Sequence, residues 1–164
     1  MHASVAVLRA FGEPLSFEEI EIPSLRKGQM LVRVEVAGVC GSDVHMWQGR
    51  DPRTPLPIIL GHEGVGRVVA ICGERRDVHG QPVLPGQRIL WERGVTCGHC
   101  YYCAVLHEPA LCPERWAYGI HHGLEQAPRL NGCYASHLIL AAHTPLIPLP
   151  DEGDPAPYVA ASCS

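Results

Sequence analysis

Long apolar runs and basic tracts are both missing from this sequence of 164 residues. No apolar stretch approaches the roughly 20 residues that span a bilayer, so we expect no membrane association. The longest basic cluster is Arg75-Arg76, which stands between Glu74 and Asp77 and is interpreted as a solvated turn. The sequence therefore predicts no nucleic-acid partner. No basic region precedes an apolar stretch at the N-terminus, which favours a cytoplasmic location.

A glycine loop for binding a dinucleotide is also missing. The glycines of residues 61–66 lack the G-x-G-x-x-G spacing of such a loop. A chain of this length is sufficient for one domain with a small satellite lobe, and it is too short for two full domains. Hydrophobic residues make up 46% of the sequence and charged residues 18%, which is typical of a globular protein.

Short segments of strand character, bounded by Gly, Pro or Asp, fill most of the first ninety residues. They are predicted at 4–8, 17–22, 31–36, 64–71 and 88–91, with one more at 132–140. Such spacing predicts a β-barrel or sandwich. Ser42-Asp43 is expected to cap a short helical turn that runs through Trp47. Residues 145–157 are expected to form a proline-rich connection, which leads into a helix at about residue 157.

Four cysteines fall within sixteen residues, at positions Cys97, Cys100, Cys103 and Cys112. The first three follow a repeated x2 spacing, which lets short loops aim several thiolates at one centre, as a structural zinc site requires. Two disulfides are the alternative, although a bridge within one CxxC is strained and easily reduced. Redox sensing through the same thiols is a further alternative. In a reducing compartment, metal binding is favoured over a disulfide framework.

A second constellation combines Cys40, Ser42, Asp43 and His45 with a later His62. A catalytic zinc keeps one position open, and a Cys, a His and a further Cys form such a ligand set, so Cys40, His62 and Cys163 are candidates. Asp43 suits the free ring N–H of a ligating histidine. Ser42 and His45 could pass a proton outward, since an alcohol must lose its hydroxyl proton before a hydride leaves its carbon. Each lone Cys or His could instead be structural.

The order of these motifs carries a family resemblance. It runs Val39-Cys40-Gly-Ser42-Asp43-x-His45, then Gly61-His62-Glu63-x2-Gly66, then the four cysteines, then Gly132-x-Tyr134-Ala135. This order resembles the GroES-like catalytic domain of the zinc-dependent medium-chain alcohol dehydrogenases. The resemblance covers essentially the whole chain.

The resemblance implies a role for each matching residue. Cys40 and His62 match the first two catalytic zinc ligands, and Cys163 falls near the third. Glu63 matches a glutamate that approaches the same zinc. Asp43 matches a carboxylate that accepts a hydrogen bond from the ligating histidine and does not itself bind the zinc. Ser42 matches the hydroxyl that contacts the substrate oxygen, and His45 the outer end of the proton relay. The four cysteines match the ligands of a structural zinc, so two zinc ions per chain are expected.

The resemblance also implies the domain organisation. Residues 1–164 are expected to form one mainly β, GroES-like barrel with short helices and a zinc-knuckle lobe at about residues 93–115. Residues 157–164 would begin the helix that leads to an absent nucleotide-binding domain. The chain is thus expected to be the zinc-binding half of an NAD(P)-dependent alcohol dehydrogenase, truncated and inactive alone.

The expected substrate is a small alcohol or polyol, or the matching aldehyde or ketone, and a homo-oligomer is possible. Trp47 and Arg50 follow the relay histidine, and Arg50 would suit a phosphate, phosphonate or carboxylate group of the substrate unless it is a solvent-exposed loop arginine. The alternative function is a stand-alone zinc-binding module that uses the barrel for protein contacts without catalysis.

Overall fold

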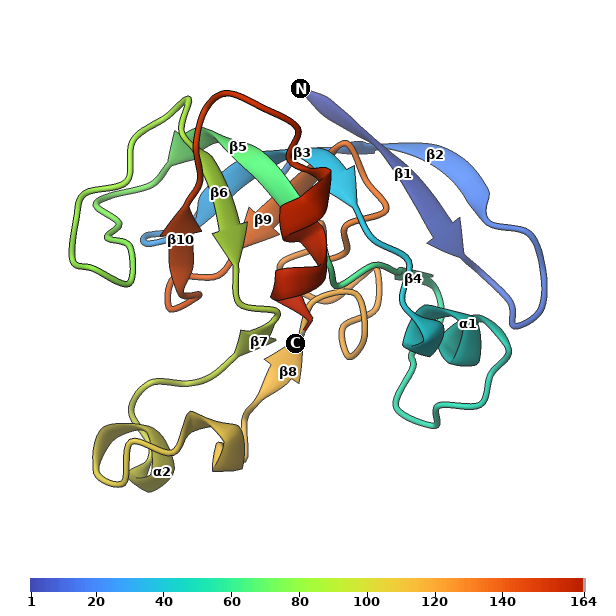
Figure 1. Cartoon of the computed structure of the whole chain (residues 1–164). Helices are drawn as coiled ribbons and strands as arrows, with labels where there is room; N and C mark the ends of the chain where they lie inside the picture. The colour runs from blue at the N-terminus through green and yellow to red at the C-terminus, as the bar shows by residue number, and fades with distance from the viewer. Residues whose placement is uncertain (164) are drawn as a thin grey trace.

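The computed structural model describes residues 1–163 and confirms a mainly β architecture with short helices (Figure 1). The strands are β1 (His2–Leu8), β2 (Ser16–Glu21), β3 (Met30–Ala37), β4 (Ile58–Ile59), β5 (Gly64–Ile71), β6 (Arg88–Trp91), β7 (Gly94–Val95), β8 (Trp116–Ala117), β9 (His137–Leu140) and β10 (Leu146–Pro148). The helices are α1 (Gly41–Trp47), α2 (Tyr101–Ala104) and the 3₁₀ helices η1 (Pro109–Leu111) and η2 (Ala156–Ser162). None of the helices described in residues 1–163 has the length and hydropathy of a membrane span.

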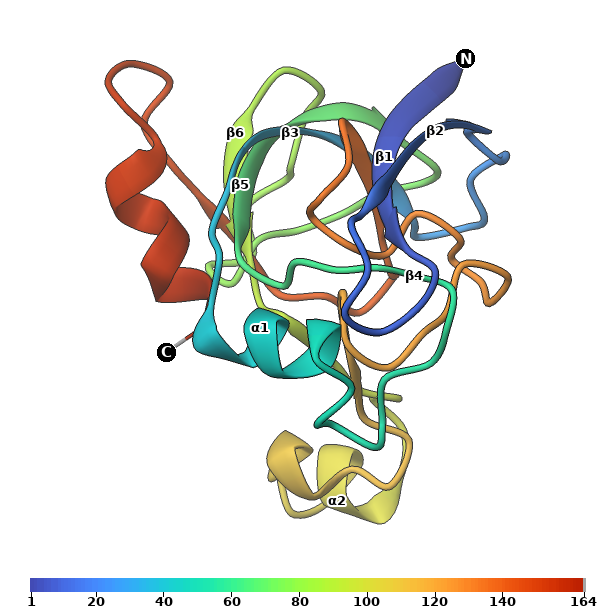
Figure 2. The same ribbon diagram turned by 90° about the vertical axis from the view of Figure 1, so that its right-hand side faces the viewer.

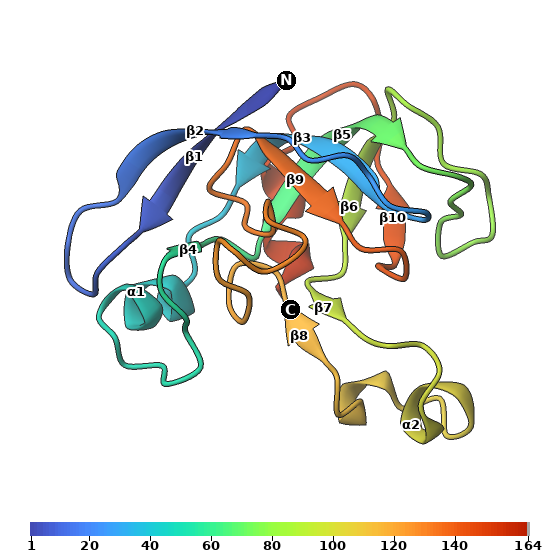
Figure 3. The same cartoon turned by 180° about the vertical axis from the view of Figure 1, so that it is seen from behind.

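The strands form three antiparallel sheets. The order is β2-β1-β4 in the first, β10-β6-β5-β3-β9 in the second and β7-β8 in the third. By this order β9 and β10 are the edge strands of the five-stranded sheet, and Figure 3 shows β7 and β8 leading away toward the lobe. Buried apolar side chains from several strands of this sheet, among them Met30, Val32, Trp91 and Leu138, pack into one core cluster.

Residues 134–136 join the two larger sheets. Ala6 N donates to Tyr134 O at 2.8 Å, Ser136 N donates to Ser4 O at 2.8 Å, and Val34 N donates to Ser136 O at 2.9 Å. This segment therefore bonds to β1 on one side and to β3 on the other, so only His137–Leu140 of the strand expected at 132–140 is regular β9. A Cβ atom at Gly132 would meet the Ile59 carbonyl oxygen, so glycine is required at this crossing.

The lobe between β7 and β8 has almost no apolar core. It projects from the barrel below the two short strands and carries α2 and η1 (Figure 1). Neither α2 nor η1 buries a residue, and Tyr101, Val105 and Leu111 are exposed. Hydrophobic burial therefore contributes little to the stability of this lobe.

The 3₁₀ helix η2 lies against the barrel beside β5 and β6, and α1 lies near the end of the described chain (Figure 2). The helix expected from about residue 157 is therefore present, in 3₁₀ form. Val159 and Ser162 are its buried residues, and Ser162 Oγ accepts from Gly64 N at 3.2 Å. This packing fixes the position of Cys163 relative to β5.

Three expectations are corrected. The N-cap of α1 is Cys40, not Ser42 or Asp43, because the Asp43 carboxylate accepts from the Cys40 N–H at 2.8 Å. The proline-rich connection contains β10, which pairs with β6. Arg75 is buried rather than solvated, since its guanidinium donates to the carbonyl oxygens of Gly28, Ala141 and Thr144 at 2.6–2.9 Å.

Glu35 on β3 binds two arginines, Arg67 on the neighbouring strand β5 and Arg88 on β6, the next strand beyond β5. Arg88 Nε donates to Glu35 Oε2 at 2.7 Å, and Arg67 Nε donates to Glu35 Oε1 at 2.8 Å. Burial opposes ionisation of Glu35, but the hydrogen bonds from Arg88 and Arg67 outweigh it and lower the pKa of this carboxyl. Arg88 is itself buried, so its charge depends on this partner.

We expect Glu35→Gln to lower the free energy of unfolding at neutral pH by about 3 kcal/mol, because it leaves the Arg88 charge buried without a carboxylate. The pKa of Glu35 is lowered in the folded state, so its contribution is present above about pH 4.3 and is lost as pH falls through the lowered pKa. Urea unfolding across the acid range measures this. The control is Glu13→Gln, at an exposed residue without an ion pair in residues 1–163. Equal effects of the two changes would contradict the prediction.

Candidate metal centres

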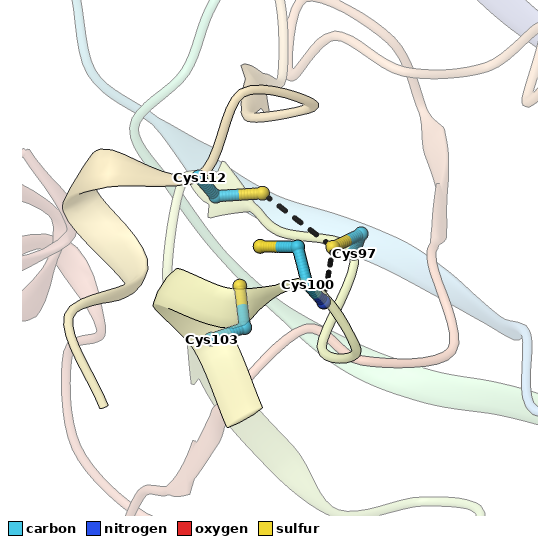
Figure 4. A group of neighbouring side chains, drawn as sticks. All are labelled: Cys97, Cys100, Cys103 and Cys112. Atoms are coloured by element: carbon cyan, nitrogen blue, oxygen red, sulfur yellow. Dashed lines mark hydrogen bonds between the residues drawn. The ribbon is translucent and has the colours of Figure 1, made fainter. Parts of the chain in front are cut away.

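The four cysteines of the lobe converge on one point. Their sulfur atoms all lie within 4.8 Å of one another, and Figure 4 shows them gathered between α2, η1 and the preceding loop. Cys112 Sγ donates to Cys97 Sγ at 3.7 Å, and Cys97 Sγ accepts from the Cys100 N–H at 3.3 Å. These are the four residues that the sequence predicts as one metal site, and the fold brings their sulfur atoms close enough to share one metal ion.

The electrostatics of this cluster favour a cation. The backbone N–H of His99 stabilises the Cys97 thiolate and contributes most to lowering the pKa of Cys97 to about 6. The pKa of Cys100 is raised to about 11, because burial and the neighbouring thiols outweigh the N–H of Cys103. Four thiolates at this separation repel one another, so a divalent cation is needed before all four lose their protons.

A second donor group forms around His62. The side-chain donor atoms of Cys40, His62, Glu63 and Cys163 lie within 4.8 Å of one another. Cys40 precedes α1, His62 and Glu63 precede β5, and Cys163 follows η2, so three separate segments contribute. His62 Nε2 lies 3.5 Å from Cys163 Sγ and 3.9 Å from Glu63 Oε1. Two thiols, an imidazole and a carboxylate are a donor set that suits zinc.

Asp43 contacts two of the three segments that form this donor group, the one with Cys40 and the one with His62. Its carboxylate is buried and lies 3.4 Å from His62 Nδ1, on the side of the ring opposite the cluster. The same carboxylate accepts from Cys40 N at 2.8 Å and from Gly61 N at 3.3 Å. Burial opposes protonation of His62, but Asp43 and Cys40 outweigh it and raise its pKa. A proton on Nδ1 facing Asp43 leaves Nε2 free to bind a metal.

The backbone just before His62 is confined by its neighbours. Gly61 has φ +91°, and a Cβ atom there would meet the ring of Tyr134. A Cβ atom at Gly119 would meet the Gly61 carbonyl oxygen, and Cys133 N donates to that oxygen at 2.8 Å. Because both approaches leave no room for a side chain, glycine is required at positions 61 and 119, and the backbone that leads into His62 is held in place.

The surroundings shift the pKa values of the two thiols of the second group in opposite directions. Hydrogen bonds from Ser42 lower the pKa of Cys40. Burial raises the pKa of Cys163 to about 11, with Glu63 adding to this effect and Arg93 opposing it. Deprotonation of both thiols is therefore favoured only when a cation occupies the group.

The other predicted residues divide into those near the group and those outside it. Ser42 Oγ lies 3.4 Å from His62 Nε2. His45 lies three residues further along α1 and is exposed, and no hydrogen bond joins it to Ser42 in the described residues. Arg50 is also exposed beyond the end of α1. An apolar cavity of about 310 Å³ borders the Asp43 side of α1 and is lined by Leu15, Val39, Asp43, Val44, Trp47, Leu60 and Tyr134.

Sequence reasoning missed one residue of this centre. Arg93 lies in the short connection between β6 and β7, and its Nη1 donates to Cys163 Sγ at 3.7 Å. Arg93 belongs to none of the recognised motifs. Its position four residues before Cys97 does not indicate that it lies beside the second donor group. Its contact with Cys163 spans 70 residues of sequence and arises only from the fold.

The alcohol dehydrogenase GroES-like domain is the family whose model matches residues 26–151 of this chain. The chain belongs to this family. An alcohol dehydrogenase from Geobacillus stearothermophilus is 34% identical over 160 residues, which are 97% of this chain and 43% of that protein. A crystal structure of an alcohol dehydrogenase from Thermotoga maritima, 49% identical, superposes with a TM-score of 0.92 over 99% of this chain and 44% of its own.

A further solved structure carries a cofactor. A short chain alcohol dehydrogenase from Escherichia coli CFT073, complexed with NADH, is 28% identical and superposes with a TM-score of 0.71, over 91% of this chain and 39% of that chain. The chain spans about two fifths of the length of the curated relatives it matches. The family resemblance and the GroES-like fold are thus confirmed.

Proposed function

We propose that this chain is the zinc-binding catalytic domain of an NAD(P)-dependent alcohol dehydrogenase. One observation carries the proposal: three separate segments bring Cys40, His62, Glu63 and Cys163 together, with the Asp43 carboxylate behind His62. A purely structural site would be closed by four fixed ligands, whereas this group mixes thiols, an imidazole and a carboxylate beside a hydroxyl. That mixture suits a site that must admit a substrate.

Two zinc ions per chain are part of the proposal. Cys40, His62 and Cys163 would hold the catalytic ion, with Glu63 beside it, and Cys97, Cys100, Cys103 and Cys112 would hold the structural ion. When bound, the catalytic ion supplies Lewis acidity that makes the hydroxyl proton of an alcohol easier to lose. The structural ion would stabilise the lobe, which has almost no apolar core of its own.

The side chains of this chain supply the proton path and the orientation. Ser42 Oγ is close enough to His62 Nε2 to contact an alcohol oxygen that enters the group, and could accept its proton. His45, exposed on the same helix, would release that proton to solvent. Asp43 fixes the tautomer of His62, so that Nε2 keeps its lone pair directed at the group.

Hydride transfer requires a nicotinamide held against the substrate carbon. We propose that residues 1–164 form the GroES-like catalytic domain, with its lobe at about residues 93–115, and that η2 leads toward a dinucleotide-binding domain. The shorter span of this chain relative to the curated relatives supports this arrangement. The substrate would be a small alcohol, oxidised to an aldehyde or ketone.

The test joins this chain to the remaining residues of the Thermotoga maritima enzyme. We expect the joined protein to reduce NAD⁺ or NADP⁺ with short alcohols in a zinc-dependent manner, measured by nicotinamide absorbance, and we expect a chelator to abolish the signal. The chain alone should give no reduction above background. If the joined protein folds and binds zinc but transfers no hydride, the alternative function, a zinc-binding module for protein contacts, would be favoured. If the chain alone reduces the cofactor, the proposal that hydride transfer needs a dinucleotide-binding domain would be contradicted.

A further inference from the structure

The Arg93 backbone is held firmly at the edge of the second donor group. Arg93 is directly followed by the buried Gly94–Val95 of β7, and the buried Trp91 that ends β6 lies two residues before it. The Arg93 carbonyl oxygen accepts from Tyr118 N at 3.1 Å. The side chain is partly buried, and its guanidinium reaches Cys163 Sγ at 3.7 Å. A cation is thereby placed beside a ligand of the proposed catalytic site.

Within residues 1–163, most of the hydrogen-bonding capacity of this guanidinium is unused. A guanidinium carries five N–H donors in a planar fork, and the contact with Cys163 occupies one of them. Among residues 1–163, Arg93 makes no ion pair with a carboxylate, including Glu63 of the same donor group. Arg53 and Arg88, by contrast, each bind a carboxylate directly.

Arg93 stays outside the ion pairs of the site. Two thiolates and one neutral imidazole around a divalent zinc carry no net charge, and the carboxylates of Glu63 and Asp43 face His62 and form no ion pair with Arg93 in residues 1–163. A second guanidinium, that of Arg115, lies over Gly94, which directly follows Arg93, and is 3.9 Å from the partly exposed Glu92. Arg115 therefore has a carboxylate partner in Glu92, whereas Arg93 has none in residues 1–163.

We infer that Arg93 is a specificity-determining residue that binds an oxyanion of the substrate, so that the enzyme acts on a short alcohol carrying a carboxylate or phosphate group. The inference deepens the proposed function and rests on it. The planar fork of arginine matches the paired oxygens of either group and can bind them in a bidentate manner. The distance from Arg93 to Cys163 requires the oxyanion to lie only a few bonds from the reacting hydroxyl.

The test measures binding rather than turnover. The 164-residue chain is loaded with Co²⁺, whose visible absorption in a thiolate site changes when a ligand enters. Three probes are titrated: 3-hydroxypropionate, 2-hydroxyethyl phosphate and the neutral 1,3-propanediol. We expect at least one anionic probe to bind about tenfold to hundredfold more tightly than the diol. The two anionic probes distinguish a carboxylate from a phosphate subsite.

Variants assign the preference to Arg93. In Arg93→Gln the anionic probes should bind no better than the diol, whereas Arg93→Lys should keep part of the preference through its charge. The matched control Arg26→Gln removes an exposed arginine and should bind all three probes as the unchanged chain does. An anion preference that persists in Arg93→Gln, or an equal loss for charged and neutral probes, would overturn the inference.

Cobalt content and probe binding together show whether a failure lies in the proposed catalytic site or only in the role of Arg93. Cobalt content is measured in each variant and in Cys40→Ala, which should lose the ion of the second group. If that content does not fall in Cys40→Ala, the proposed catalytic site is wrong and both proposals are overturned. If it falls, but the unchanged chain binds charged and neutral probes alike, only the role of Arg93 is overturned.

Discussion

Replacing Cys40 with alanine is expected to lower the zinc content from two ions per chain to one and to reduce hydride transfer by at least about 10³-fold in the joined protein. Cys40 is the donor group's only member from the α1 region, and its N–H is bound by the same carboxylate that faces His62. Loss of its thiolate would leave too few ligands, and Lewis-acid stabilisation worth several kcal/mol would disappear. Elemental mass spectrometry and a steady-state assay measure the two effects.

The matched control for this change is Cys72→Ala. Cys72 is partly exposed and lies outside both donor groups, so this variant should keep two zinc ions and full activity. Circular dichroism should show both variants folded, since the barrel core does not include either residue. A Cys40→Ala protein that still binds two zinc ions would show that Cys40 is not a ligand.

Replacing Cys97 with alanine is expected to remove the other zinc ion and to unfold the lobe, while the barrel stays folded. Neither α2 nor η1 buries a residue, so metal ligation would be the main source of order there. In zinc-finger peptides the binding of structural zinc contributes roughly 10–16 kcal/mol to the apparent free energy of folding. The Cys97→Ala change would remove the corresponding contribution from the lobe. Zinc analysis should show one ion per chain, and hydrogen exchange should accelerate only between β7 and β8.

His99 provides a control for this second change. Cys97, His99 and Glu114 also lie close enough together to hold a metal, although His99 and Glu114 are exposed. The four-thiolate assignment predicts that His99→Ala keeps both zinc ions. Loss of zinc in His99→Ala with retention in Cys112→Ala would show that the site uses His99 and Glu114 in place of the other cysteines.

Local patterns predicted the fold class well. Alternation of apolar residues identified β3, and turn residues bounded β5 and β6 with the observed limits of the strands. The errors lie where tertiary contacts override local preference. Residues 134–136 bridge two sheets instead of continuing β9, and β10 forms within a proline-rich segment because β6 offers it an edge to pair with.

Arg75 and Cys40 show why single residues were misjudged. An arginine beside acidic residues normally faces solvent, but the turn that carries Arg75 folds onto the carbonyl oxygens of Gly28, Ala141 and Thr144. Serine and aspartate are usual N-cap residues, but here Asp43 lies in the first turn of α1 and its carboxylate accepts a hydrogen bond from Cys40 N. This bond positions Cys40 in the second donor group. The partners of Arg75 lie 47 to 69 residues away and are invisible in the local sequence, whereas Cys40 lies only three residues before Asp43 and was missed because cysteine is not a usual N-cap residue.

The sequence by itself determined the residue types and the spacings over short distances: the x2 repeat of the lobe cysteines, the motif from Cys40 to His45, and the order that identifies the family. Covalent spacing alone brings such residues together. The tertiary structure decided which distant residues meet, bringing Cys163 to His62 across 101 residues and Arg93 to Cys163 across 70. These two contacts depend on how η2 and the β6–β7 connection pack against the barrel. That packing is determined by the whole core and not by any local segment.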